Sequence, residues 1–171
     1  REGEPFIDDH IWTTEPIVDY LTQFSGIQPD DLDPKRTQRT LVSHKTAYKK
    51  LRMLTDLGCR FIGHGLAKDF RIINIFVPPS QVIDTVQLYH SPAHPRNLSL
   101  RFLSWFLLKK DIQQGLALGV EQHDGHDSIE DALAALQLFR KYEQFERDGR
   151  LEDMLEDLYE IGPRVNWRPP E

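Results

Sequence analysis

An alternation of helical and extended patterns between residues 43 and 86 limits the folds open to this chain more than any other feature. Apolar residues recur at helical spacing over Ser43–Leu57, and Gly58 follows them. The short apolar run Cys59–Gly63 is typical of a buried strand. Residues Lys68–Phe76 repeat the helical pattern and stop before a Pro-Pro pair, and Val82–Val86 is again strand-like. Because helices that alternate with strands build layered sheets, we expect an α/β domain.

Helical patterns also occur on both sides of this alternation. The segment Thr13–Ser25 predicts a helix that ends before Gly26, and the polar, proline-containing segment Gln28–Arg39 predicts a loop. Farther along, Leu98–Leu108 predicts an apolar helix and Asp127–Phe145 a long one. The sequence has no internal repeat and no pattern for a second core, which favours a single domain.

Composition narrows the class of protein. With 171 residues, 39% of them hydrophobic, and no run of about eighteen apolar residues, the chain is expected to be a soluble domain with its own core. The single cysteine, Cys59, excludes an internal disulfide and a multi-cysteine zinc site. This cysteine usage fits a reducing compartment, so we expect the protein in the cytoplasm or nucleus.

The net charge of −6 is unusual for a protein that binds nucleic acid through excess Lys and Arg. Carboxylate-bound divalent metals reverse that sign locally, so an acidic nuclease is still consistent with the composition. The candidate phosphate contacts are the basic residues of two segments, namely Lys35 to Arg39 and Lys45, Lys49, Lys50 and Arg52. The alternative is that they form an ordinary solvated surface.

One cluster of ionisable residues, Gly125–Ala132, lies where the long helix is expected to begin. Asp127 followed three residues later by Glu130 is a capping-box arrangement, which gives both side chains a local role. His126 then lies in the preceding loop, and Asp131 lies in the first turn, where the helix dipole favours a carboxylate. A mobile imidazole beside a fixed carboxylate suits a general base next to a metal ligand. The alternatives are a surface histidine and an acid that only compensates the dipole.

A second cluster follows the strand that ends at Gly63. A Gly-His-Gly turn leads into a helix that carries Asp69 near its start, and ligands of open α/β sheets gather at the carboxyl ends of strands. Asp69 is therefore a candidate ligand, with a simple helix-terminal acid as the alternative. His64 is interpreted as a turn or supporting residue. Asp84 is either a structural acid at the end of its strand or a group that supports the site.

Taken in order, these motifs resemble the DEDDh 3′→5′ exonucleases. The resemblance is carried by Gly-His-Gly-x-x-x-Asp at 63–69, Ile-Asp-Thr at 83–85, Arg-Phe-Leu-x-Trp at 101–105 and His-Asp-Ser-x-Glu-Asp-Ala at 126–132. Within this family, residues 6–10, 18–27, 31–34 and 68–71 are similar to the catalytic subunits of poly(A)-nuclease deadenylation complexes. The similarity extends from about Pro5 to Tyr142.

The resemblance implies an RNase H-like α/β fold, in which a central mixed sheet is flanked by helices. It further implies two divalent metal ions, Mg²⁺ or Mn²⁺, with Asp69 and Asp131 as metal ligands and His126 as general base. The family's first motif, an Asp-x-Glu on the first strand, is absent from these residues. We therefore expect that the domain, residues 1–146, lacks its first strands, and that this chain is inactive by itself. Residues 147–171 are expected to form an acidic tail that packs on the domain.

The function implied by the resemblance is removal of adenylates from mRNA poly(A) tails with release of 5′-AMP. The implied partners are single-stranded poly(A) RNA, a pseudokinase-like regulatory subunit and, indirectly, poly(A)-binding protein, and the implied location is the cytoplasm, including mRNA-processing bodies. Two alternatives remain: an exonuclease of this family that acts on other RNA or DNA 3′ ends, and a non-catalytic module for RNA binding or assembly. The joint presence of Asp69, His126 and Asp131 favours the enzyme.

Overall fold

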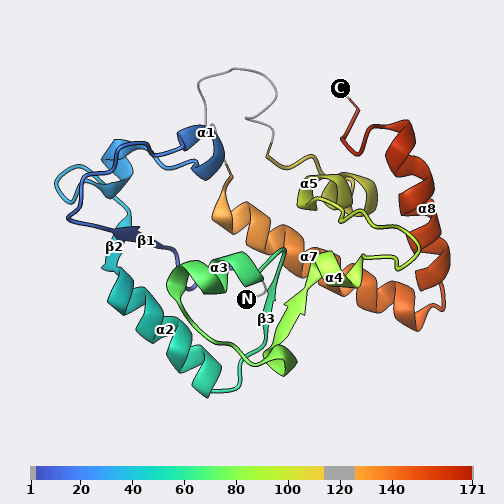
Figure 1. Ribbon diagram of the computed structural model, residues 1–171, viewed down its shortest axis with the longest axis horizontal. Coiled ribbons are helices and arrows are strands. Elements are labelled where there is room, and N and C mark those ends of the chain that lie inside the picture. The colour runs from blue at the N-terminus through green and yellow to red at the C-terminus, as the bar shows by residue number, and fades with distance from the viewer. Residues whose placement is uncertain (1–2, 114–125, 171) are drawn as a thin grey trace. The chain divides into compact units, whose positions relative to one another are not determined.

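The computed structural model describes residues 3–113 and 126–170, which form two compact units (Figure 1). The first unit comprises Arg1–Arg60, Ala67–Val82 and Gln113–Ile129, and the second comprises Phe61–Leu66, Ile83–Ile112 and Glu130–Glu171. The chain therefore passes between the units several times.

A pair of parallel strands organises the first unit. Strand β1 (Asp9–Trp12) pairs in parallel with β2 (Thr40–Ser43), with Asp9 opposite Thr40 and Trp12 opposite Ser43. Parallel strands need a connection of about a dozen or more residues, and here it contains the short helix α1 (Thr22–Ser25) and the 3₁₀ turn η1 (Pro29–Leu32).

The predicted helix over residues 13–25 is wrong except for its last turn. The Asp19 carboxylate accepts the backbone N–H of Leu21 at 2.8 Å, and this local bond competes with a helix. Leu21 itself has a φ of 48°, which is outside the right-handed helical region, so α1 begins only at Thr22. Gly26, with a φ of 69°, ends the helix as predicted.

The helix predicted over residues 43–57 is confirmed as α2 (His44–Asp56). The hydroxyl of Ser43 accepts the backbone N–H of Thr46 at 3.2 Å and caps the helix. The side-chain amide of Gln81, from the 3₁₀ turn η2 (Pro79–Gln81), donates to the Thr55 carbonyl at 3.0 Å and to the Cys59 carbonyl at 2.9 Å. These bonds fix the C-terminal end of α2.

Helix α3 (Ala67–Ile73), also in the first unit, is shorter than predicted. Asn74 has a φ of 57°, so the backbone leaves the helical conformation before Phe76. The strand predicted over Val82–Val86 is also shorter than predicted.

The second unit contains the strand pair β3 (Phe61–Gly63) and β4 (Val82–Asp84). The predicted strand Val82–Val86 ends at Asp84 because this carboxylate accepts the Val86 N–H at 3.0 Å and caps α4 (Thr85–Leu88). The apolar segment predicted as one helix forms α5 (Leu100–Leu103) and a π-helical turn, η3 (Ser104–Leu108).

Two long helices complete this unit, α7 (Ser128–Arg147) and α8 (Leu151–Arg164). The core of this unit contains the fully buried residues Tyr89, Phe102, Leu103, Leu138 and Leu158. The Tyr89 hydroxyl donates to the Leu138 carbonyl at 2.8 Å, and burial raises the pKa of this tyrosine. Because Leu158 belongs to α8, the prediction that the C-terminal segment packs on the domain is confirmed.

The predicted α/β class is confirmed, although the strands do not join into one central sheet. Within the described residues they form two separate two-stranded sheets. Each strand has only three or four residues. Strands β2 and β4 lead directly into helices, so each pair is short. No helix in the described ranges is both long and apolar enough to span a membrane.

Candidate active site

Asp69 lies in the first turn of α3, where its side chain is exposed to solvent. The helix dipole favours a carboxylate at this position, and the first peptide groups of a helix leave backbone donors unused by the helix itself. The predicted position of Asp69 near the start of a helix is therefore confirmed, whereas its role as a metal ligand stays a prediction.

Asp131 occupies the matching position in α7. It lies in the first turn, beside Glu130, and is half-buried. The Asp127 carboxylate accepts the Ile129 N–H at 2.8 Å, so Asp127 caps this helix as predicted. Asp127 therefore has a structural task at the start of α7, and Asp131 is the first-turn carboxylate that the sequence assigns to chemistry.

His126 lies in the loop immediately before α7, where it is half-buried. Its backbone N–H donates to the carbonyl of Phe24 at 3.1 Å, so the loop is tied to the end of α1. This bond is made by the main chain of His126. The ring of Phe24 is 58% exposed, which places a solvent-facing aromatic residue next to the candidate general base.

Asp84 holds together the turn that precedes α3. Its Oδ1 accepts the Gly65 N–H at 2.8 Å and the Val86 N–H at 3.0 Å, and its Oδ2 accepts the Leu66 N–H at 3.0 Å. Three backbone donors thus converge on one carboxylate. This geometry agrees with both alternatives that the sequence left open, because the turn that Asp84 holds at the end of its strand leads into α3.

His64 lies in the same turn and contacts Thr85. The Thr85 hydroxyl donates to the Gly63 carbonyl at 3.0 Å, and His64 Nδ1 lies 2.8 Å from Thr85 Oγ1. Because the one hydroxyl proton is used on Gly63, His64 Nδ1 is the donor to Thr85. Burial lowers the pKa of His64, while the carboxylates of Asp84 and Asp131 and a hydrogen bond to the backbone of Leu98 oppose that shift.

The influence of Asp131 on His64 is a feature that the sequence did not predict. Sequence reasoning placed His64 in the turn as a supporting residue, which agrees with its bond to Thr85. It offered no sign that the helix carrying Asp131 returns close enough to act on the same imidazole. The Gly63-His64-Gly65 pattern predicts a turn, but Asp131, which acts on His64, comes from a distant part of the chain.

The chemistry of the candidate ligands fits hard divalent cations. Carboxylate oxygens are the donors that Mg²⁺ and Mn²⁺ prefer. Asp69 belongs to the first unit and Asp131 to the second. Within residues 3–113 and 126–170, no group of three or more His, Cys, Asp or Glu side chains gathers as it would around a metal. Each aspartate therefore supplies carboxylate oxygens of the kind that these ions bind.

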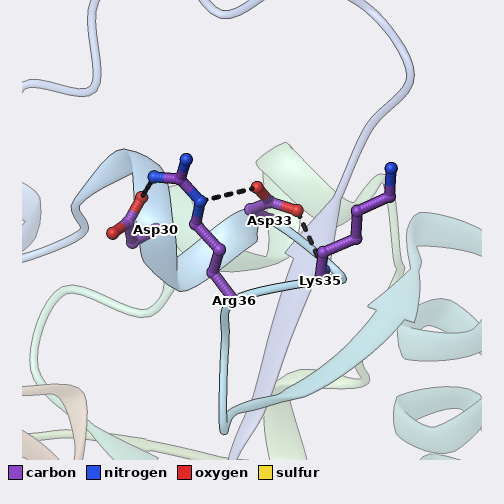
Figure 2. A network of polar contacts seen from close by, with 4 residues as sticks. All are labelled: Asp30, Asp33, Lys35 and Arg36. Atoms are coloured by element: carbon purple, nitrogen blue, oxygen red, sulfur yellow. Dashed lines mark hydrogen bonds and ion pairs between the residues drawn. The ribbon is translucent and has the colours of Figure 1, made fainter.

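Most of the basic residues proposed as phosphate contacts are ion-paired. Arg36 bridges Asp30 at 3.0 Å and Asp33 at 3.6 Å, as Figure 2 shows, and Asp33 also accepts the backbone N–H of Lys35 at 2.9 Å. Three further pairs join Arg39 to Asp31, Lys50 to Asp9 and Arg52 to Asp56. Because neighbouring carboxylates offset these cations, the structure favours the alternative of an ordinary solvated surface.

Comparison with known proteins places this chain among nucleases. It is 58% identical to the PAN2-PAN3 deadenylation complex catalytic subunit PAN2 of Chaetomium globosum over 170 residues, which cover 99% of this chain and 15% of that protein. The Schizosaccharomyces pombe subunit is 51% identical over the same length, again 99% of this chain and 15% of that protein. The chain thus spans about 15% of the length of these relatives.

Solved structures agree with this placement. The Neurospora crassa Pan2 catalytic unit, with protease and nuclease domains, matches 93% of this chain and 25% of its own at a TM-score of 0.85 and 58% identity. The Saccharomyces cerevisiae Pan2 pseudoubiquitin hydrolase-RNA exonuclease module in complex with AAUUAA RNA matches 99% of this chain and 26% of its own at a TM-score of 0.86 and 43% identity.

These likenesses support the RNase H-like fold expected from the motifs. Exonucleases of this kind generally use divalent metal ions, in agreement with the carboxylate donors described above. The sequence model of the exonuclease family named for RNase T matches residues 1–139, which include Asp69, His126 and Asp131. The chain therefore belongs to this exonuclease family.

Proposed function

We propose that this chain is the catalytic domain of a 3′→5′ exoribonuclease that shortens mRNA poly(A) tails and releases 5′-AMP. The observation that carries the proposal is the 58% identity, over 99% of the chain, to a deadenylation-complex catalytic subunit. A Saccharomyces cerevisiae Pan2 module solved in complex with A7 RNA is 41% identical and supports single-stranded adenosine-containing RNA as the substrate class.

In this proposal Asp69 and Asp131 hold two divalent ions, Mg²⁺ or Mn²⁺. Bound ions of this type activate a water molecule and stabilise the charge on the leaving 3′ oxygen. Both aspartates lie in the first turns of their helices, where the helix dipole favours a carboxylate. The remaining ligands are assigned to an Asp-x-Glu motif that these 171 residues do not contain.

His126 is the proposed general base, which takes a proton from the attacking water. A histidine side chain accepts protons near neutral pH, and a base positioned in this way contributes about 10²- to 10⁴-fold to the rate. The bond from its backbone N–H to the Phe24 carbonyl restrains the loop that carries His126.

Phe24 is the proposed stacking surface for a base near the 3′ end of the RNA. Its ring is 58% exposed, and its carbonyl accepts the N–H of His126. Stacking on an aromatic ring is worth about 1–3 kcal/mol per base and tolerates different bases, so it holds single-stranded RNA without selecting adenine by itself. A Phe24→Ala variant should therefore raise KM for RNA far more than it lowers kcat.

The relatives are named as catalytic subunits of a PAN2-PAN3 complex, so we include a regulatory subunit among the partners of this protein. A pseudokinase-like fold for that subunit and an indirect link to poly(A)-binding protein follow from the family resemblance. A cytoplasmic location, including mRNA-processing bodies, fits deadenylation and the single cysteine.

The test is digestion of 5′-labelled poly(A) by the full-length protein with Mg²⁺ or with EDTA. We expect metal-dependent shortening one nucleotide at a time, lost in His126→Ala and Asp131→Asn and retained in Glu143→Gln. Glu143 and Asp131 both lie on α7, but Glu143 is exposed and Asp131 is half-buried. The Glu143→Gln variant therefore controls for the loss of one negative charge from the same helix. The 171-residue chain alone should be inactive.

The competing functions give different results in the same assay. A folded full-length protein that binds RNA but never shortens it would support a non-catalytic module. Equal rates on poly(A) and on other RNA or DNA 3′ ends would support a general 3′→5′ exonuclease and contradict the assignment as a deadenylase. Full activity in Asp131→Asn would reject the proposed ligand.

A further inference from the structure

Asp84 and Thr85 lie side by side where β4 ends, and both reach across to the Gly63–Leu66 turn. The two oxygens of Asp84 accept the N–H groups of Gly65 and Leu66 at 2.8 and 3.0 Å. Ala67, the first residue of α3, follows Leu66 directly in the chain, and Asp69 lies in the first turn of that helix. The last two residues before the helix with a candidate metal ligand are thus held by one carboxylate.

Thr85 fixes the other half of the turn. Its side chain is fully buried, its hydroxyl donates to the Gly63 carbonyl at 3.0 Å, and its oxygen lies 2.8 Å from Nδ1 of His64. The turn is also tightly packed, because a Cβ added at Gly63 would collide with the side chain of Leu66. Gly65, with a φ of 79°, adopts a conformation that other residues rarely take.

We propose that Asp84 and Thr85 are positioning residues of the metal site, which hold the turn before α3 and the imidazole of His64. This inference rests on the proposed function. Through the backbone, the clamp sets where the helix bearing Asp69 begins. Hydrogen-bond partners behind metal ligands typically change metal affinity by about 10- to 100-fold when they are removed.

Thr85→Val and Thr85→Ser, made in the full-length protein, separate positioning from folding. Valine has the shape of threonine but leaves the Gly63 carbonyl and His64 Nδ1 without the hydroxyl, whereas serine keeps it. Mn²⁺ binding is measured by calorimetry, with Asp131→Asn identifying the site, and the Mg²⁺ dependence of kcat and KM is measured on 5′-labelled poly(A). We expect Thr85→Val to weaken Mn²⁺ binding about tenfold with KM for RNA unchanged, and Thr85→Ser to restore it.

Asp84→Asn is the second variant, in case the valine protein does not fold. Asparagine can still accept the N–H groups of Gly65 and Val86, but its amide group would face the Leu66 N–H, so one bond of the clamp is lost. Wild-type Mn²⁺ affinity in either folded variant would overturn the proposal, as would a serine variant as impaired as the valine one. Because Mn²⁺ binding is read without RNA, a wild-type protein that binds the ion but does not trim RNA refutes only the proposed function.

Discussion

Replacing Leu158 with alanine tests whether the C-terminal helix is part of the core of the second unit. Leu158 is 0% exposed in α8 and belongs to the same cluster as Phe102 and Leu138. Leu→Ala substitutions at fully buried sites lower the free energy of unfolding by about 2–5 kcal/mol. The cost has two parts, namely the loss of buried apolar surface and the cavity that remains because the surrounding side chains relax only partly. We expect a loss of about 3 kcal/mol in the free energy of unfolding, which for a chain of this size lowers Tm by about 10 °C.

The measurement is urea denaturation of the wild type and the variant, followed by circular dichroism and by tryptophan fluorescence. The control is Glu156→Ala, an exposed position on the same helix that should change stability by less than about 0.5 kcal/mol. If Leu158→Ala costs less than about 1 kcal/mol, or no more than the control, then α8 does not share the core and the reasoning from burial is wrong.

Three further predictions concern an ion pair, a glycine and a histidine. Lys50→Ala should lower the free energy of unfolding by about 1–3 kcal/mol, because the Asp9 carboxylate, 8% exposed and 2.6 Å from Lys50 Nζ, loses its cation. Gly162→Ala should destabilise the protein by about 1–3 kcal/mol despite the better helix propensity of alanine, because the new Cβ would meet the ring of Trp167. The stability contributed by neutral His64 should be present above about pH 6.5 and be lost as the pH falls through the lowered pKa of the folded state, because the unfolded chain then binds the proton more readily.

Each of these predictions has its own control in chemical denaturation. Arg52→Ala removes an exposed pair on the same helix as Lys50 and should change stability far less than Lys50→Ala does. In a Trp167→Ala background, adding Gly162→Ala should cause no further loss of stability, since the ring that the new Cβ would meet is gone. His64→Gln, compared with the wild type at about pH 7.5 and pH 5 in EDTA, should show the weaker pH dependence. Equal pH dependence in both proteins would contradict the argument from burial.

Local patterns were read correctly where the sequence carried strong signals at both ends of an element. The helix after Ser43 has a capping hydroxyl at its start and a glycine at its end, and both act within a few residues. The prediction over residues 13–25 failed for an equally local reason. The Asp19 side chain bonds to the Leu21 backbone and replaces the helical bonds that the apolar spacing suggested.

The candidate site divides in the same way. Asp69 and Asp131 were predicted at the starts of helices, and the structure places both there, because first-turn acids and caps are readable from adjacent residues. The bond from His126 to Phe24 was not predicted, because its partners lie at opposite ends of the first unit's sequence. The metal-binding role of the two aspartates remains a prediction.

By itself the sequence determined the α/β class, most of the main helices and the positions of the candidate site residues at the starts of helices, since periodicity, caps and motifs are properties of neighbouring residues. Tertiary structure alone decided what surrounds those residues. It brought Asp84 to the amides of Gly65 and Leu66, His64 under the influence of Asp131, and Leu158 into the core. These contacts depend on the path of the chain between distant segments, and that path is set by burial of apolar surface and by pairing of backbone groups, which no local pattern records.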